Sequence, residues 1–201
     1  MLHIGVTGGI GSGKSTFLRV WERIGVPVVY ADELAKELMV SDDSLKKKIA
    51  SAFGERSYRQ DGSLNREYLA EAAFAAGRVE ELNSIVHPAV FRQLEIMKEK
   101  AREDGAPIFA HESALMLTSE RAADCDVVVL VACPEQERIR RVTRRDGTNP
   151  DHVKNRIRKQ PEFDRLSDKA DIVVNNTGTP DSLAAKAEEL YRELVKRSEK
   201  S

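Results

Sequence analysis

The chain has 201 residues, of which 41% are hydrophobic, enough for a compact domain with a substantial core. Its 32 Lys and Arg residues nearly balance 33 Asp and Glu residues, and the net charge of -1 argues against a nucleic-acid partner or a membrane surface. The sequence shows neither a membrane-spanning apolar run nor a signal peptide, so we expect a cytoplasmic protein.

Five short apolar runs, most of them rich in Val or Ile, predict buried strands at 2–7, 27–30, 107–110, 126–132 and 171–175. Charged segments with helical spacing lie between them. These predict helices at 15–24, over 34–103 with breaks near Asp61-Gly62 and His87-Pro88, within 135–169, and at 181–197. Strands that alternate with helices indicate an α/β fold, with a five-stranded parallel sheet covered by helices on both faces.

The first strand runs into a glycine-rich loop, Gly8 to Ser15, that fits G-x-x-x-x-G-K-[ST] between a strand and a helix. Glycines let successive backbone N–H groups turn toward one anion, and the helix start adds the positive end of its dipole. Lys14 is expected to reach the β- and γ-phosphates, Ser15 to ligate Mg²⁺, and Thr16 to contact the α-phosphate. The expected ATP-binding residues here are Gly9, Gly11, Ser12, Gly13, Lys14, Ser15 and Thr16.

Two acids follow predicted strands, where ligands of open parallel sheets bind. Asp32 comes two residues after the second strand and is a candidate to orient the attacking hydroxyl or accept its proton. The alternative is that Asp32 caps a helix starting near Glu33. Glu112 follows the third strand, where it either holds a magnesium-bound water or serves as a cap or surface acid.

An arginine-rich segment follows the fourth strand. Arg138, Arg141 and Arg145 share one face of a predicted helix, and Arg140 and Arg144 form a neighbouring stripe. Such a face is either solvated or a lid that closes on triphosphate, and the phosphate loop elsewhere in the chain favours the lid. Further along, Arg156 and Gln160 lie one helical turn apart.

The two cysteines, Cys125 and Cys133, flank the fourth strand without C-x-x-C spacing, so a free thiol is favoured for each over a disulfide or a metal ligand. The four histidines are scattered along the sequence and suggest no zinc motif.

Nearly the whole chain resembles the dephospho-coenzyme A kinase family of P-loop kinases. The resemblance rests on Gly8 to Ser15, Val29 to Asp32, Val86-His87-Pro88, Arg141 to Asp146, Arg156-Ile157 with Gln160, and Lys169 to Asp171 followed by Asn175-Asn176. One departure is Glu112-Ser113-Ala114-Leu115-Met116, which stands where the family usually has D-x-P-L-L-F-E.

The resemblance implies phosphorylation of the ribose 3′-hydroxyl of dephospho-coenzyme A by ATP with Mg²⁺. It implies a single kinase domain over 1–201, with a substrate-binding helical insertion at about 34–105 and a lid at about 135–169. Implied catalytic residues are Asp32, Lys14, Arg141 and Arg145. Implied substrate-binding residues are Asp32, His87, Glu112, Arg156 and Gln160, and Asn176 is placed near the adenine.

Two other functions share the phosphate loop. A nucleoside or nucleotide monophosphate kinase would also share the lid, but the second-strand acid and the H-P and R-I-x-x-Q elements favour the coenzyme A reaction. A GTPase-like switch lacks support, because the sequence contains neither an N-K-x-D guanine-reading motif nor a D-x-x-G after the third strand.

Overall fold

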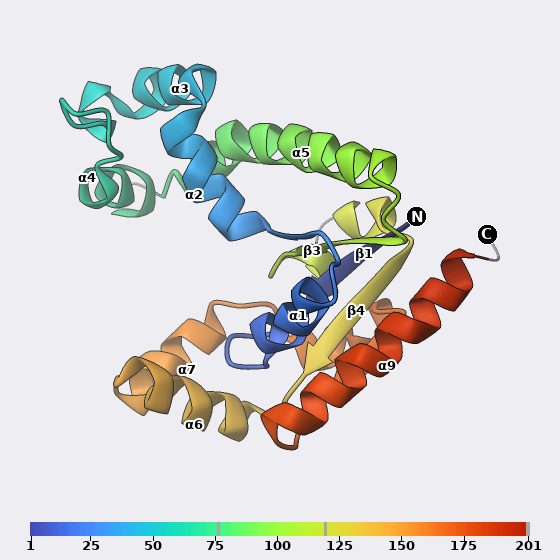
Figure 1. The fold of residues 1–201 in the computed structure, drawn as a ribbon. Coiled ribbons are helices and arrows are strands. Elements are labelled where there is room, and N and C mark those ends of the chain that lie inside the picture. Colours follow the sequence, from blue (N-terminus) through green and yellow to red (C-terminus); the bar gives the residue numbers. More distant parts are fainter. Residues whose placement is uncertain (76, 119, 200–201) are drawn as a thin grey trace. The chain divides into compact units, whose positions relative to one another are not determined.

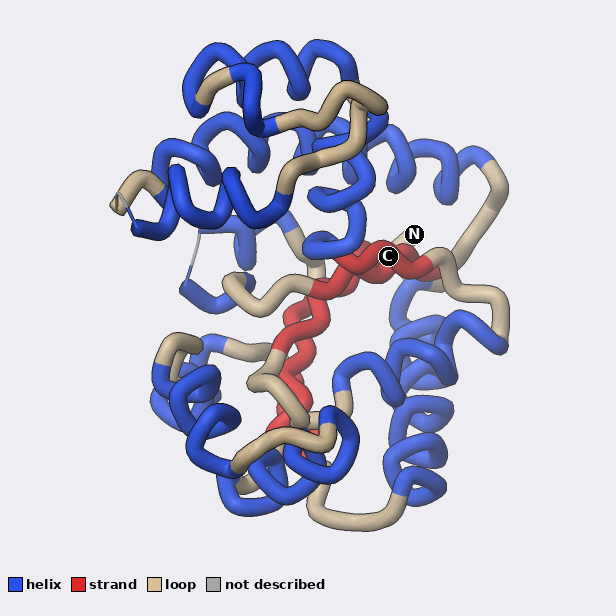
Figure 2. The backbone as a smooth tube through the Cα atoms, turned by 90° about the vertical axis from the view of Figure 1, so that its left-hand side faces the viewer, coloured by secondary structure: helices blue, strands red, loops and turns tan. Residues whose placement is uncertain are grey.

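The computed structural model describes residues 1–75, 77–118 and 120–199, and its central feature is one five-stranded sheet (Figures 1 and 2). The strands are β1 (Leu2–Thr7), β2 (Val28–Tyr30), β3 (Ile108–Glu112), β4 (Val127–Ala132) and β5 (Ile172–Asn175), in the order β2-β3-β1-β4-β5. β1 runs parallel to both β3 and β4, and β4 runs parallel to β5. All five predicted strands are therefore present, and the α/β fold is confirmed.

Burial along the sheet follows strand position. Every residue of the central strand β1 is buried, as the continuous apolar run predicted. The edge strand β5 differs, because Val173 is 40% exposed. The expectation that every strand is buried on both faces is wrong there, because Val173 and Asn175 point to the same face of β5 and both are exposed.

The chain forms two compact units, residues 1–29 with 100–201, and residues 30–99. The first unit contains most of the sheet and the helices α1 (Lys14–Arg23), α6 (Glu135–Asp146), α7 (Pro150–Arg158), α8 (Phe163–Leu166) and α9 (Pro180–Ser198). Its 3₁₀ helices span Met116–Thr118, Glu120–Asp124 and Ser167–Lys169. Organisation as one kinase domain stays a prediction.

Helices α1 and α9 pack against each other and anchor the element that follows the phosphate loop. The indole Nε1 of Trp21, on the buried face of α1, donates to the carbonyl oxygen of Ala187 in α9 at 2.8 Å. The apolar face of α9 repeats with helical spacing, and its buried residues are Leu183, Ala187, Leu190 and Leu194. The helix that follows the phosphate loop is thereby packed along one face against α9.

The second unit is built from α2 (Ala31–Ser41), α3 (Asp43–Phe53), α4 (Arg66–Ala70) and most of α5 (Val79–Glu103), with a 3₁₀ helix at Glu55–Ser57 and a π-helical turn at Glu71–Ala75. The predicted break at His87-Pro88 is wrong, because Pro88 lies inside α5. The buried positions Val86, Val90 and Leu94 continue the helical spacing across the proline, and such packing outweighs the lost backbone hydrogen bond.

Candidate active site

The phosphate loop joins β1 to α1 through three glycines in conformations that other residues rarely adopt. Gly8, Gly11 and Gly13 have φ values of 146°, 75° and 103°. Gly13 is the N-cap of α1 and Lys14 is the first residue of the helix, one residue earlier than the predicted start at residue 15. The loop therefore delivers the N-terminus of a ten-residue helix to the carboxyl end of the sheet, an arrangement suited to anions.

Lys14 contacts both the loop backbone and Glu112. Its Nζ donates to the Gly8 carbonyl oxygen at 2.6 Å and lies 3.4 Å from a carboxylate oxygen of Glu112. Both side chains are largely shielded from solvent, at 12% exposed for Lys14 and 14% for Glu112. The register of β1 and β3 explains the pairing, because Val6 lies opposite Glu112. Glu112 is also the last residue of β3, so the strand extends through it instead of ending before it.

Ser15 and Thr16 occupy the first turn of α1 with exposed side chains. A serine hydroxyl and a carboxylate are hard oxygen donors of the kind that Mg²⁺ prefers. Ser15 and Glu112 therefore fit a magnesium ion chemically, and the sequence analysis named Ser15 for this role.

Asn176, the residue after β5, binds the backbone of the phosphate loop. Its Nδ2 donates to the Ser12 carbonyl oxygen at 2.7 Å, and Asn176 is 5% exposed. A Cβ at Gly13 would run into this amide, so close packing as well as the φ value requires glycine there. Asn176 thus supports the loop from behind. Its expected place near adenine stays a prediction.

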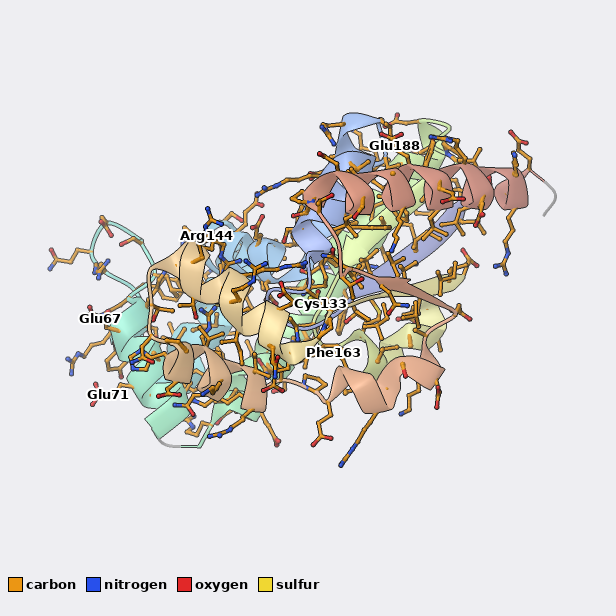
Figure 3. All side chains as sticks on the ribbon, turned by 90° about the horizontal axis from the view of Figure 1, so that it is seen from below. Glu67, Glu71, Cys133, Arg144, Phe163 and Glu188 are labelled. Carbon is orange, nitrogen blue, oxygen red and sulfur yellow. The ribbon has the colours of Figure 1, made fainter. Side chains whose placement is uncertain are left out.

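A cavity of about 410 Å³ opens beside the loop, lined among others by Gly9, Ser12, Cys133, Arg138 and Phe163. Figure 3 labels Cys133 and Phe163, which reach it from the end of β4 and from α8. Burial raises the pKa of the Cys133 thiol, so this residue lines the cavity as a neutral group.

Two buried polar atoms at this cavity have no hydrogen-bond partner within the described part of the chain. They are Oγ of Ser12 and Nε of Arg138, and the two residues are 1% and 7% exposed. The Arg138 guanidinium lies over Gly9, where a Cβ would run into it. The charge of Arg138 at this cavity suits an anionic ligand.

Helices α6 and α7 pack together and dock on the phosphate loop. Val142, Val153 and Ile157 form a buried cluster, against which Ile10 of the loop packs. The Ile10 N–H donates to Oε1 of Gln160 at 2.7 Å. Gln160 lies just past the end of α7, so it does not share that helix with Arg156. Its position beyond the helix lets the amide reach the loop.

The predicted arginine face does not behave as one stripe. Arg138 is buried, whereas Arg141 is half-buried and donates to the carbonyl oxygens of Asn176 and Gly178, both at 3.3 Å. Arg145 is exposed and pairs with Asp146 at 2.7 Å. A hydrogen bond from Arg145 holds the pKa of Asp146 below its usual range, and Arg156, 3.0 Å away, adds a second.

Asp32 and His87 belong to the second unit, whereas the loop and the arginines belong to the first. Helix α2 begins at Ala31 with Tyr30 in the cap position, so the alternative that Asp32 caps a helix starting near Glu33 is wrong. Asp32 lies in the first turn with an exposed side chain. His87 lies on α5 beside Phe91, with 5.7 Å between ring centroids.

Sequence reasoning placed Arg138 in the stripe but missed it as a site residue. Its distinguishing feature, burial over Gly9, depends on where α6 docks. The contact between Ile10 and Gln160 was missed for the same reason, since 150 residues separate them. None of the helices in the described ranges is both long and apolar enough to cross a membrane.

Comparison with known proteins places this arrangement among kinases. The family model described as dephospho-CoA kinase matches residues 2–181. The dephospho-CoA kinase of Salinibacter ruber is 44% identical over 192 residues, which cover 95% of this chain and 96% of the relative.

Solved structures agree on the fold. A Thermus thermophilus protein of known crystal structure has a TM-score of 0.79 and 32% identity, over 96% of this chain and 97% of its own. The dephospho-CoA kinase from Campylobacter jejuni has a TM-score of 0.65, 22% identity and 96% coverage of both chains.

Proposed function

The chain belongs to the dephospho-CoA kinase family of phosphotransferases, and we propose that it transfers the γ-phosphoryl group of ATP to the ribose 3′-hydroxyl of dephospho-coenzyme A, the final step of coenzyme A synthesis. The observation that carries the proposal is the shielded Lys14 beside Glu112 on an intact phosphate loop. In this reaction Lys14 would exchange the Gly8 carbonyl for oxygens of the β- and γ-phosphates, where charge develops as the phosphoryl group moves.

The cavity beside the loop supports the same function. Ser12 and Arg138 line it together with Gly9 of the loop, and a guanidinium at this place suits the phosphate oxygens of a nucleotide that extends from the loop. When bound, Mg²⁺ would neutralise charge on the β- and γ-phosphates, and Ser15 and Glu112 are the residues proposed to hold it. Asp32 is proposed to align the attacking hydroxyl, and Arg141 and Arg145 to neutralise transferring charge.

His87, Glu112, Arg156 and Gln160 keep their proposed roles toward dephospho-coenzyme A. Gln160 is already engaged with the loop backbone, so it would act on the substrate through loop position as well as by contact. The cytoplasm stays the expected location of the reaction.

An ADP-release assay with a panel of acceptors tests the proposal. Dephospho-coenzyme A should give ATP-dependent turnover, and ³¹P NMR of the product should show a new 3′-phosphomonoester. Nucleoside monophosphates and nucleosides serve as the comparison panel. Faster turnover with a monophosphate than with dephospho-coenzyme A would move the chain to nucleotide kinase chemistry and refute the acceptor named here.

A further inference from the structure

Three potential metal ligands, His3, His111 and Cys125, gather inside the first unit, outside the machinery described above. His3 comes from β1, His111 from β3, and Cys125 follows the 3₁₀ helix Glu120–Asp124. Nε2 of His3 lies 2.9 Å from Nδ1 of His111. One donor atom from each of the three residues lies within 4.8 Å of the other two. His3 is 4% exposed and His111 7%, so the imidazoles face each other inside the protein.

The strand register explains why these groups meet. His3 and Gly5 point to the same face of β1 because side chains alternate along a strand, and Gly5 lies opposite His111. A Cβ at Gly5 would lie 2.9 Å from the Cys125 sulfur and 2.8 Å from the Met116 methyl carbon. The missing side chain of Gly5 therefore leaves the space that two sulfur-containing residues fill, with Cys125 Sγ 3.9 Å from Met116 Sδ.

The backbone around Cys125 is tied to His3 on both sides. The His3 N–H donates to Oδ2 of Asp126 at 2.7 Å, and the Asp126 N–H donates to the His3 carbonyl oxygen at 2.9 Å. Nδ1 of His3 lies 2.9 Å from the Asp124 carbonyl oxygen. A carbonyl oxygen can only accept, so the proton of the neutral imidazole is on Nδ1 and Nε2 carries the lone pair. Histidines that bind metals are oriented by such a bond from the other ring nitrogen.

We propose that His3, His111 and Cys125 bind one thiophilic transition-metal ion of the zinc class, with the Met116 thioether as a soft neighbour. Two imidazole nitrogens and one thiolate are typical zinc donors, and thiolate and thioether together select soft or borderline ions over Mg²⁺. A core histidine pair would need only its mutual hydrogen bond, whereas here the Cys125 sulfur lies within 4.8 Å of a ring nitrogen of each histidine and 3.9 Å from the Met116 sulfur.

Binding requires two proton changes. The Cys125 thiol releases its proton to solvent and the sulfur binds as thiolate. His111 shifts its proton from Nδ1 to Nε2, so that Nδ1 joins Nε2 of His3 as a ligand. The thiolate and the Asp126 carboxylate behind His3 offset the charge of the ion. The ion would join β1, β3 and the segment before β4, one residue from Glu112.

Cobalt(II) titration of the tag-free full-length protein tests the site, because cobalt replaces zinc and reports its ligands by absorption. We expect one equivalent of Co²⁺ to produce a thiolate-to-cobalt charge-transfer band, which Zn²⁺ abolishes by displacement. Zn²⁺ at 100-fold its dissociation constant should raise the melting temperature by about 5 °C or more. Wild-type protein without a charge-transfer band would overturn the proposal without any variant.

Matched variants locate the ligands. Cys125→Ser, a near-isosteric change, should remove the band, and His111→Gln should weaken metal binding by about tenfold or more. Cys133→Ser changes the other cysteine, and His152→Gln changes an exposed histidine. Both should keep the band, with circular dichroism confirming that each variant is folded. A band that survives in Cys125→Ser or disappears in Cys133→Ser would refute the assignment.

Discussion

Lys14 carries the charge of the phosphate loop. Its side chain is shielded from solvent and contacts both the Gly8 carbonyl oxygen and Glu112. Lys14→Ala should lower turnover by about 10²–10³, the usual effect of removing one preorganised donor. Steady-state ADP release measures it, with the exposed Lys48→Ala as control. If the Lys14 variant turned over as fast as the Lys48 variant, the loop would not carry the reaction.

Gly11 is required for two separable reasons, its φ of 75° and its close packing. A Cβ there would lie 2.7 Å from Cγ2 of Val142 and 2.9 Å from the Arg138 carbonyl oxygen. Gly105 has a similar φ of 78° and nothing within 4 Å of such a Cβ, so Gly105→Ala isolates the backbone strain.

We expect Gly105→Ala to cost about 1–2 kcal/mol of unfolding free energy and Gly11→Ala about 1–3 kcal/mol more, because it also overpacks the contact with α6. Urea unfolding of both variants measures the difference. Equal losses would show that α6 does not press on the loop in solution.

At the scale of elements, the arginines of α6 differ in their contacts. Arg141 is held by carbonyl oxygens beyond β5 and Arg145 by Asp146, whereas Arg144 is exposed on the same helix (Figure 3). Arg141→Ala and Arg145→Ala should each slow phosphoryl transfer by about tenfold or more, and up to about 10³–10⁵ where the guanidinium touches the transition state. Single-turnover rates measure the effect, and Arg144→Ala is the matched control. Two rates equal to that of the control would show that Arg141 and Arg145 take no part in transfer.

Local patterns predicted the elements well. The apolar runs predicted all five strands, and the helix predicted at 15–24 begins one residue earlier, at Lys14. Each of these signals lies within about ten residues of the structure it determines. Pro88 is the informative failure, because its local preference for a break is outweighed by the buried face of α5.

Contacts between residues far apart in the chain could not be predicted from the sequence. Gln160 meets Ile10, Asn176 meets Ser12, and Cys125 approaches His3 only through strand register and docking. The scattered histidines and isolated cysteines carried no recognisable spacing for that reason. The residue types that follow each predicted strand can be read from the sequence. For that reason the phosphate loop, Glu112 and Asp32 were identified as candidate site residues.

At the scale of the whole molecule, the proposed reaction draws on both compact units. The phosphate loop, Glu112 and the arginines belong to residues 1–29 and 100–201, whereas Asp32 and His87 belong to residues 30–99. The chain passes between the units immediately before Tyr30, two residues from Asp32. Asp32, proposed to align the attacking hydroxyl, thus belongs to a different unit from the phosphate loop, so we expect a change at Asp32 to affect transfer without affecting ATP binding.

Asp32→Asn tests this division most sharply. The amide keeps the shape and one acceptor oxygen but loses the charge and the basicity, so kcat should fall by about 10²–10⁴. The dissociation constant for ATP, measured by calorimetry, should stay within about twofold. Because Tyr30 occupies the cap position, the variant should also unfold at nearly the wild-type urea concentration.

The exposed Glu33, next to Asp32 in the first turn of α2, supplies the control Glu33→Gln, which removes one negative charge from the same helix end. If both variants lost activity equally, the helix-end charge would matter rather than Asp32 itself. If Asp32→Asn kept wild-type kcat, the acid would have no part in transfer. If only Asp32→Asn lost activity and ATP binding stayed intact, the role of Asp32 would be to align or deprotonate the attacking hydroxyl. Alignment would account for much of the effect, because the transition state of phosphoryl transfer is loose.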